Sequence, residues 1–332
     1  MVLSWQIVKF QLKETFAIAY GNYSFREALI VTLESHGCKG YGECTAIDYY
    51  HIDLASFTTL LAQHKSRIEN QSISHPIEFY AFLESLQLPS FLRSALDCAY
   101  WDLFGKLEQR SFIALNAIDY NQVPESSITI SVDSVAQQIK KIDQSAWNHF
   151  KVKCNHLDKE GVVQLLALNK PIALDSNGSF TGTDCQWLED SVGIENFSYL
   201  EQPMKPGAEQ YTVLNAEGKA NWMADEDCQD ATKLKDLVLH YKSVNIKLVK
   251  CGGLTPALEM ITEARALGFQ VMIGCMTESS IGISAGAALA PLCDYADLDG
   301  ANLIANDLAS GSTIVNGRIQ LSEGNGLGIK IK

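Results

Sequence analysis

The chain has 332 residues, of which 47% are hydrophobic and 20% charged, and its formal net charge is −13. This length can bury a large core and accommodates one barrel and a smaller domain. The negative charge argues against nucleic acid and anionic membranes as partners. The nine cysteines form no CxxC pair, which argues against a zinc ribbon or a thioredoxin-type site. We find no secretory leader and no apolar run of about 20 residues, so we expect a cytoplasmic protein without a membrane span.

The first third of the chain predicts an α+β domain. Residues 1–45 have the pattern of antiparallel strands, with polar loops that contain Gly and Tyr expected over 20–25 and 45–52. Residues 53–110 then show the 3.6-residue apolar period of helices. Strands followed by a run of helices indicate a domain that is distinct from the rest of the chain.

From about residue 127 onward, short apolar runs alternate with helical patterns. We expect eight strands, near residues 129–132, 150–153, 172–175, 198–201, 222–225, 244–248, 271–275 and 295–299. Eight parallel strands with crossover helices make a TIM-type barrel, whose catalytic groups lie at the C-terminal ends of its strands. The predicted organisation is a capping domain over 1–120, a barrel over 121–310, and a tail over 311–332 that returns to the capping domain.

Polar residues end five consecutive strands of this predicted barrel. Starting at Lys153, they recur at intervals of 22 to 26 residues as Asp175, Glu201, Asp225 and Lys247. Such an interval corresponds to about one strand, one helix and two loops. The sequence therefore predicts two amines that flank three carboxylates around one rim of the barrel.

The three carboxylates predict a metal site. Asp175, Glu201 and Asp225 would converge on adjacent strands, and three buried like charges need a cation beside them. Hard oxygen ligands suit Mg²⁺, which completes its shell with water or substrate oxygens. The alternative for each residue is a helix N-cap in the loop that follows its strand. This alternative explains one carboxylate well, but not three at matching strand ends.

The two strand-end lysines predict acid–base chemistry. Lys153 and Lys247 would lie on opposite sides of the barrel, one on each face of the α-carbon of a substrate whose carboxylate binds the metal. A lysine serves as a base when its pKa falls toward about 7–8, and burial, a cation and the neighbouring Lys151 would each lower it. Alternatively, Lys151 or Lys247 pairs with an acid or binds phosphate. Lys250 lies past its strand end and is expected to be structural.

The sequence resembles the enolase superfamily, and most of all the dipeptide epimerases of its muconate-lactonizing subgroup. The resemblance rests on segments between about residues 93 and 300, namely ALDCAYWDLFGK, KVK, LDSN, EQP, ADED, NIKLVKCGGL, GCMTESSIGISA and DLDG. It implies a modified (β/α)₇β barrel with an N-terminal capping domain. It further implies that the three carboxylates bind one Mg²⁺ and that the two strand-end lysines move the α-proton. Lys151 would lower the pKa of Lys153.

Within this family, the DLDG segment points to a dipeptide substrate. In the dipeptide epimerases a DxD at the end of the eighth strand holds the free α-ammonium, and Asp297 and Asp299 match that position. A carboxylate pair is suited to select a cationic amine. The alternative is a plain turn, which Asp and Gly also favour. The resemblance also assigns Ser131, Met276 and Thr277 to the substrate lining.

One position departs from the family pattern. Similar Ala-Glu epimerases place an arginine in the first capping loop, where it pairs with the glutamate side chain of the substrate. Counted from Phe16, that place holds Gly21 or nearly so, and Arg26 lies further along. Arg26 is therefore the expected partner of an acidic side chain, or alternatively a structural residue of the capping sheet.

We expect a Mg²⁺-dependent dipeptide epimerase that transfers a proton at the α-carbon of the C-terminal residue of an L,L/L,D dipeptide, with Ala-Glu favoured. N-acylamino acid racemase, o-succinylbenzoate synthase and muconate cycloisomerase share the lysines and carboxylates but bind no ammonium. A Schiff-base aldolase would use one lysine as a nucleophile, and a non-catalytic binding protein is a third alternative. The sequence leaves a homo-oligomer open.

Overall fold

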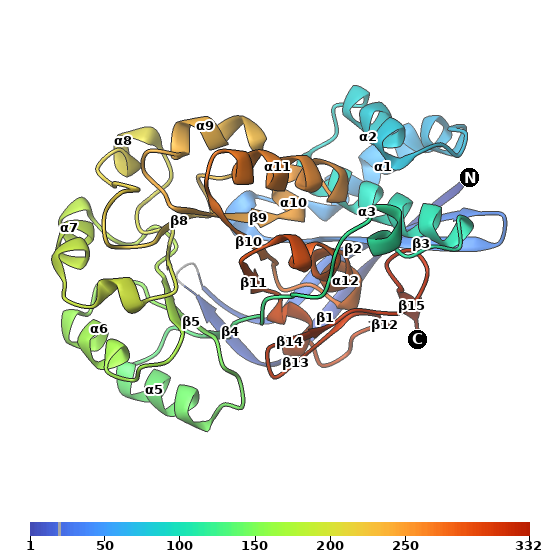
Figure 1. Ribbon diagram of the computed structural model, residues 1–332. Helices are drawn as coiled ribbons and strands as arrows, with labels where there is room; N and C mark the ends of the chain where they lie inside the picture. The colour runs from blue at the N-terminus through green and yellow to red at the C-terminus, as the bar shows by residue number, and fades with distance from the viewer. Residues whose placement is uncertain (19–20) are drawn as a thin grey trace.

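The computed structural model describes residues 1–18 and 21–332. It contains a three-stranded antiparallel sheet with its helices, and beside it an eight-stranded parallel barrel ringed by helices (Figure 1). This arrangement confirms the predicted fold class, whereas the predicted domain boundaries stay a prediction. Within the described residues, no helix is both long and apolar enough to cross a membrane.

The N-terminal sheet consists of β1 (Val2–Ile18), β2 (Gly21–Ser35) and β3 (Cys38–Thr45), in that order. β1 and β2 form a long hairpin whose register extends to Ile18 opposite Gly21. The predicted loop over 20–25 is therefore wrong from Gly21 onward, while Tyr20 lies outside the described residues. The start of β2 is largely solvent-accessible. Its polar composition is therefore compatible with a strand, because an exposed hairpin arm needs no apolar face.

Helices cover the N-terminal sheet and lead to the barrel. They are η1 (Asp48–Tyr50), α1 (Leu54–Glu69), α2 (Pro76–Ser85), α3 (Ser90–Leu107) and α4 (Phe112–Leu115). Two glycines of β3 allow α3 to lie directly on the sheet. A Cβ at Gly42 would be 1.9 Å from Ala95 O, and a Cβ at Gly40 would be 2.1 Å from Ala99 O. Any side chain at either glycine would push α3 away from the sheet.

The barrel strands follow one another around the ring in sequence order. They are β4 (Ile128–Ile130), β5 (Phe150–Lys153), β6 (Ile172–Asp175), β7 (Leu200–Glu201), β8 (Trp222–Ala224), β9 (Ser243–Lys247), β10 (Gln270–Gly274) and β11 (Tyr295–Asp297). Every predicted barrel strand overlaps the observed one.

Helical segments connect these strands. They are α5 (Val135–Gln144), α6 (Lys159–Leu166), α7 (Gly182–Asp190), η2 (Ile194–Asn196), α8 (Ala208–Tyr211), η3 (Ala231–Lys233), α9 (Leu234–Leu237), α10 (Leu248–Cys251), α11 (Leu254–Ala266), α12 (Ser280–Leu289) and η4 (Ala290–Leu292). Each strand from β4 to β10 is followed by an α-helix, whereas β11 leads into the 3₁₀ turn η5 (Asp299–Leu303). The described barrel therefore has the predicted (β/α)₇β pattern.

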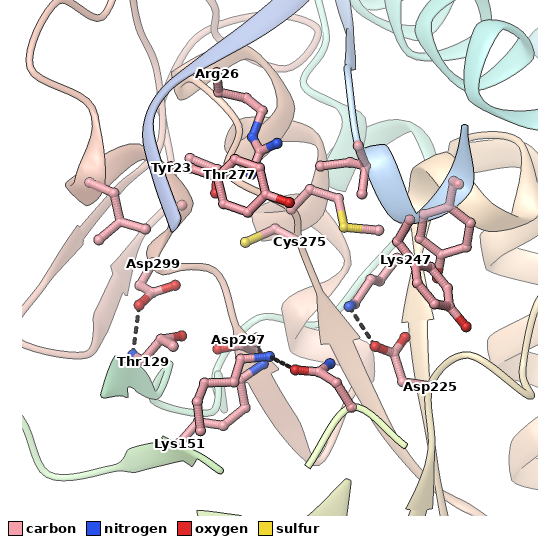
Figure 2. Close-up of a pocket in the computed structure, with 18 of the residues that line it drawn as sticks. Tyr23, Arg26, Thr129, Lys151, Asp225, Lys247, Cys275, Thr277, Asp297 and Asp299 are labelled. Carbon is pink, nitrogen blue, oxygen red and sulfur yellow. Dashed lines mark hydrogen bonds and ion pairs between the residues drawn. The ribbon is translucent and has the colours of Figure 1, made fainter. Parts of the chain in front are cut away.

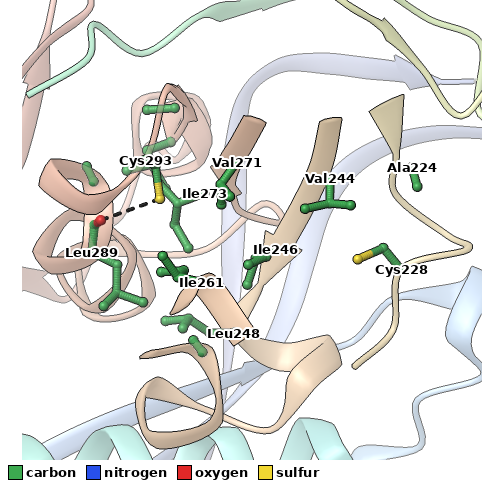
Figure 3. Packing of buried hydrophobic residues seen from close by; sticks show 14 of the residues in the cluster. Ala224, Cys228, Val244, Ile246, Leu248, Ile261, Val271, Ile273, Leu289 and Cys293 are labelled. Atoms are coloured by element: carbon green, nitrogen blue, oxygen red, sulfur yellow. Dashed lines mark hydrogen bonds between the residues drawn. The ribbon is translucent and has the colours of Figure 1, made fainter. Parts of the chain in front are cut away.

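Successive strand residues face alternately inward and outward. Val244 and Ile246 face outward and pack in one cluster with Ile261 of α11 and Leu289 of α12 (Figure 3). The inward residues form a separate apolar layer of Ala173, Tyr199, Met223 and Met272. The positions two residues further along β6, β7 and β8 face the same interior one layer higher, and they hold the three predicted metal ligands.

The ring is closed between β11 and β4. One parallel bridge joins Ser126 to Ala296, and the Ser127 N–H donates to Ala296 O at 2.9 Å. Nearer the rim, Asp299 Oδ2 accepts a hydrogen bond from the Thr129 N–H at 2.7 Å. A carboxylate of the DLDG segment thus holds the end of the last strand against the first.

Two carboxylates of the N-terminal part cap barrel helices. Glu43 of β3 accepts hydrogen bonds from Ser279 N–H at 3.0 Å and Gly282 N–H at 3.2 Å, at the start of α12. Asp97 of α3 accepts one from Thr255 N–H at 2.9 Å, at the start of α11. Both carboxylates satisfy helix N–H groups that have no partner within the helix and face the positive helix end. They therefore tie the N-terminal part to the barrel.

The C-terminal segment returns across the molecule. Its strands pair as β12 (Ala309–Ser310) with β15 (Lys330–Ile331), and β13 (Thr313–Val315) with β14 (Arg318–Gln320). Leu327 N–H donates to Asp102 Oδ1 at 2.8 Å, and Lys106 Nζ donates to Ile329 O at 3.2 Å. The tail therefore lies against α3, beside the N-terminal sheet.

Candidate active site

A cavity lies at the C-terminal ends of the barrel strands. Strand β2 and the segment 47–50 also contribute to its wall, so both parts of the molecule enclose it (Figure 2). The predicted site residues that line it are Arg26, Lys151, Lys153, Asp225, Lys247, Met276, Thr277, Asp297 and Asp299. The fold thus brings together groups that are more than 270 residues apart in the sequence.

The three predicted metal ligands lie on adjacent strands at this rim. Asp175 at the end of β6 is in register with Glu201 at the end of β7, and Asp225 directly follows β8. All three are at most 1% exposed. Burial raises the pKa of Glu201 to about 8, and the charges of Asp175 and Asp225 contribute to this rise. Such mutual repulsion is what a bound cation relieves.

Each predicted base is paired with one of these carboxylates. Lys153 Nζ donates to Asp175 Oδ2 at 2.5 Å. Lys247 Nζ donates to Asp225 Oδ2 at 2.7 Å (Figure 2). Lys250, which is buried, donates to Asp225 Oδ1 at 2.6 Å. Burial alone would raise the pKa of Asp225, but Lys247 and Lys250 hold it well below its ordinary value.

The carboxylates in turn determine the protonation of the lysines. Burial lowers the pKa of Lys247, but Asp225 and Glu201 raise it more, so the pKa lies well above its ordinary value. Lys151 behaves in the same way, because its ammonium group pairs with Asp297 and lies 3.4 Å from Glu201 Oε2. At both lysines the neighbouring carboxylates therefore outweigh burial, and a cation bound to these carboxylates would oppose their effect on the lysine pKa.

The side-chain donors fit a small divalent cation. Among the described residues, no three His, Cys, Asp or Glu side chains already surround a common metal position. Lys153 and Lys247 instead hold one oxygen each of Asp175 and Asp225. Glu201 Oε2 is buried and accepts no hydrogen bond from the described part of the chain. A carboxylate oxygen of this kind, between two further carboxylates, matches the hard oxygen donors that Mg²⁺ prefers.

The two aspartates of the DLDG segment have different surroundings. Asp297 Oδ1 accepts a hydrogen bond from Ser127 Oγ at 3.0 Å, and Oδ2 accepts one from Lys151. Asp299 Oδ2 accepts from the Thr129 N–H at 2.7 Å at the edge of the cavity (Figure 2). Burial raises the pKa of Asp299 to about 6, and the charge of Asp297 contributes. A cationic group in the cavity would therefore stabilise the charged form of Asp299.

Arg26 of β2 lies at the cavity wall. Its guanidinium is 4.2 Å from the centre of the Tyr23 ring, and Nη1 donates to Ala46 O at 3.1 Å. Its Nε–H is buried and finds no acceptor among the residues described. The other candidate position, Gly21, does not line this cavity. Arg26 therefore presents a positively charged guanidinium to the site. The group is held in position by Tyr23 and Ala46, and its Nε–H remains able to donate a hydrogen bond.

One predicted lining residue lies elsewhere. Ser131 follows β4 and lines a neighbouring cavity, whereas Thr129 lines the main one. The predicted strand extended to residue 132, whereas β4 ends at Ile130. The role of Ser131 in the substrate lining stays a prediction. Asn177 and Glu226 also line the cavity and were missed. Their signal was present in the sequence, because Asn177 lies two residues after Asp175 and Glu226 directly follows Asp225.

The barrel and its rim of lysines and carboxylates define the class of protein. A family described as Enolase C-terminal domain-like matches residues 134–332, which is more than half of the chain. The chain belongs to this family, within the enolase superfamily that the sequence resembles.

Similar proteins narrow the class further. The L-Ala-D/L-Glu epimerase of Escherichia coli is 36% identical over 326 residues, which are 93% of this chain and 96% of the relative. The L-Ala-D/L-amino acid epimerase of Flavobacterium johnsoniae is 35% identical over 332 residues, 97% of each. The solved dipeptide epimerase from Enterococcus faecalis, complexed with Mg and L-Leu-L-Tyr, is 26% identical with a TM-score of 0.87 over 99% of both chains. The chain is accordingly an enzyme of the isomerase class.

Proposed function

We propose that this enzyme is a divalent-cation-dependent dipeptide epimerase that inverts the α-carbon of the C-terminal residue. The observation that carries the proposal is the placement of Lys153 and Lys247. They end β5 and β9, which are four places apart in a ring of eight strands and hence opposite each other. Strands β6, β7 and β8, with the three carboxylates, fill the arc between them.

This placement suits a 1,1-proton transfer. Inversion of a carbon centre requires a base on one face and an acid on the other. The neutral Nζ of one lysine removes the α-proton, and the ammonium of the other lysine donates a proton to the opposite face. One C–H bond breaks and one forms, and the two lysines exchange protonation states. The same pair therefore catalyses both directions.

The acidity of the α-proton depends on the metal site. Asp175, Glu201 and Asp225 are the residues that would hold Mg²⁺. A bound divalent cation would anchor the substrate carboxylate and stabilise the negative charge that develops when the α-proton leaves. Strand β2 and Tyr50 help to enclose the cavity, which supports exclusion of water during the transfer.

The DLDG segment supports a free amino terminus as the second recognition element. Asp299 lies at the cavity edge, and a substrate ammonium there would donate a charge-assisted hydrogen bond to its carboxylate. Asp297 would contribute charge while it holds Lys151. N-acylated amino acids carry no ammonium group, so this feature favours dipeptides over the N-acylamino acid racemase alternative.

Arg26 supports an acidic C-terminal residue, with Ala-Glu as the favoured dipeptide. Its cation lines the cavity and retains a donor, and a glutamate side chain would supply both the charge and the acceptor. The proposal agrees with the names of two relatives, which are epimerases of L-Ala-D/L-Glu and of L-Ala-D/L-amino acid dipeptides.

Incubation with a dipeptide library in D₂O tests the proposal directly. Substrates should gain one deuterium at the α-carbon of the C-terminal residue, detected by mass spectrometry, together with the epimer. Free dipeptides should be labelled faster than N-acetyl or N-succinyl amino acids. The opposite preference would replace the epimerase by the racemase, and absence of labelling in both groups would refute proton transfer.

A further inference from the structure

Asn245 is a buried amide on the inner face of β9, two positions before Lys247. It is fully buried, and its Nδ2 donates a hydrogen bond to Glu201 Oε1 at 2.7 Å. Glu201 lies two strands away, on β7. The amide therefore reaches across the barrel interior to one oxygen of a proposed metal ligand.

The other oxygen of Glu201 has a different environment. Oε2 accepts no hydrogen bond within the described part of the chain and lies 3.4 Å from Lys151 Nζ. Oε1 is thus bound to a neutral donor, whereas Oε2 faces the charge of Lys151 without a hydrogen bond, and this difference gives the carboxylate a defined orientation. Fixed orientation of this kind is what partners of metal-ligating carboxylates provide.

A glycine on the next strand leaves room for this amide. A Cβ added at Gly274 of β10 would lie 2.3 Å from Asn245 Oδ1 and 2.9 Å from Nδ2. Both distances are far below van der Waals contact, so any side chain at Gly274 would displace the amide. Gly274 does not have a positive φ angle, so its backbone conformation does not itself require glycine. The need for glycine here is therefore one of space, and the space is taken by Asn245.

We propose that Asn245 is a positioning residue that fixes Oε1 of Glu201 and thereby presents Oε2 to the divalent cation, with Gly274 providing the space that the amide needs. This inference rests on the proposed metal site. It adds two residues that neither touch the substrate nor bind the metal themselves, and it assigns different tasks to the two oxygens of Glu201.

A neutral donor suits this task better than a charged one. A lysine or arginine at position 245 would add a cation that repels the metal, and an aspartate would add a fourth carboxylate to a buried cluster. The backbone of Asn245 is held separately, because its carbonyl accepts from Lys250 Nζ at 3.1 Å. Replacement of the side chain therefore removes the amide donor while this backbone contact remains available.

The test compares cation affinity in three variants with that of the wild type. Asn245→Leu keeps the branched shape but is larger and removes the donor, Asn245→Ala removes the donor with less steric risk, and Gly274→Ala displaces an intact amide. Mg²⁺ binding is measured by isothermal titration calorimetry, and Mn²⁺ binding by electron spin resonance. Loss of such a partner weakens metal affinity by about 10- to 100-fold, so we expect Kd to rise by that factor in all three variants.

Asn221 supplies the matched control. It also carries an amide in the barrel, but its Nδ2 donates to Ser198 O at 2.7 Å, at the opposite end of the strands. Asn221→Leu should lower the midpoint of thermal unfolding and leave the Kd for Mg²⁺ unchanged. A purely structural role of Asn245 would produce the same pattern in Asn245→Leu, that is, lower stability with wild-type cation affinity, and would overturn the inference.

The two levels of the proposal fail in distinguishable ways. A wild-type enzyme that binds neither Mg²⁺ nor Mn²⁺ would refute the metal site and this inference with it. A wild type that binds Mg²⁺ while Asn245→Ala and Gly274→Ala bind it equally well would refute only the positioning role. If Asn245→Leu does not fold, these last two variants decide the question.

Discussion

Lys151 donates a hydrogen bond to Asp297, so that one ion pair joins the KVK and DLDG segments across the barrel. The two residues lie on β5 and β11, with β4 between them in the ring. The second oxygen of Asp297 accepts from Ser127 Oγ at 3.0 Å. Both oxygens of Asp297 are therefore engaged by two other elements of the protein, whereas in the described part of the chain Asp299 is held by Thr129, whose N–H donates to Oδ2.

This asymmetry predicts that Asp299 carries the selection for a free amino terminus. A hydrogen bond between charged groups contributes about 1.5–3 kcal/mol. Asp299→Asn should therefore lower kcat/KM for a free dipeptide by about ten- to a hundredfold. N-acetylation of the dipeptide should cause a similar loss in the wild type and little further loss in Asp299→Asn. Steady-state kinetics of the wild type and of Asp299→Asn, each with matched free and acetylated dipeptides, measures both losses in kcat/KM.

Asp297→Asn serves as the contrasting variant. It removes the partner of Lys151, and we expect kcat to fall for free and acetylated dipeptides alike. Equal sensitivity of both variants to acetylation would show that the two aspartates share the ammonium, and the division of roles would be wrong.

Removal of the cation should abolish activity. Glu201, with a pKa raised to about 8, lies between Asp175 and Asp225 in a buried cluster whose repulsion a cation relieves. We expect excess chelator to stop turnover and Mg²⁺ to restore it. Mg²⁺ at a hundred times its Kd should also stabilise the fold by about 2.7 kcal/mol. Glu201→Gln should lose most of this stabilisation, and full activity in excess chelator would contradict the ligand assignment.

The opposed lysines should act on opposite epimers. Lys153→Ala and Lys247→Ala should each lower epimerisation by about 10²–10⁴-fold, because one of the two proton transfers is lost. Each variant should retain exchange of the α-proton with D₂O for the one epimer whose proton faces the remaining lysine. Nuclear magnetic resonance of each pure epimer measures this exchange. If both variants exchange both epimers at the same rate, the lysines do not serve separate faces.

The cap that Glu43 places on α12 should stabilise the whole enzyme. Glu43 is buried, and its loss leaves the N–H groups of Ser279 and Gly282 without their acceptor. We expect Glu43→Ala to cost about 2 kcal/mol or more. Glu34→Ala is the control on the same sheet, because its ion pair with Lys39 is exposed and contributes about 0–1 kcal/mol. Equal midpoints of thermal unfolding in the two variants would argue against the cap.

The sequence was most informative where polar residues end apolar runs. Lys153, Asp175, Glu201, Asp225 and Lys247 could be placed on one rim because alternation within a strand and the length of a β/α unit are both local rules. The same rules predicted the fold class. The end of the first barrel strand was less certain, because β4 ends at Ile130 and not at residue 132, which leaves Ser131 beyond the strand and beside a neighbouring cavity.

Other features depend on contacts that no local pattern encodes. The cap of Glu43 on Ser279 joins residues 236 positions apart. The loop predicted over 20–25 is largely strand because β1 supplies a pairing partner, which composition alone does not reveal. The pairing of Lys151 with Asp297 likewise follows from barrel closure, which brings the first and last strands together.

Arg26 should determine the preference for an acidic C-terminal residue. It lines the cavity with its guanidinium held by the Tyr23 ring and by Ala46 O, so its position is fixed before substrate binds. Arg26→Gln removes the charge and keeps donors, and we expect kcat/KM for Ala-Glu to fall by about ten- to a hundredfold. The value for Ala-Ala should change little. Arg26→Lys should restore only part of the Ala-Glu activity, because an ammonium cannot form the two parallel hydrogen bonds of a guanidinium. Equal losses for Ala-Glu and Ala-Ala would instead make Arg26 a structural residue of the N-terminal sheet.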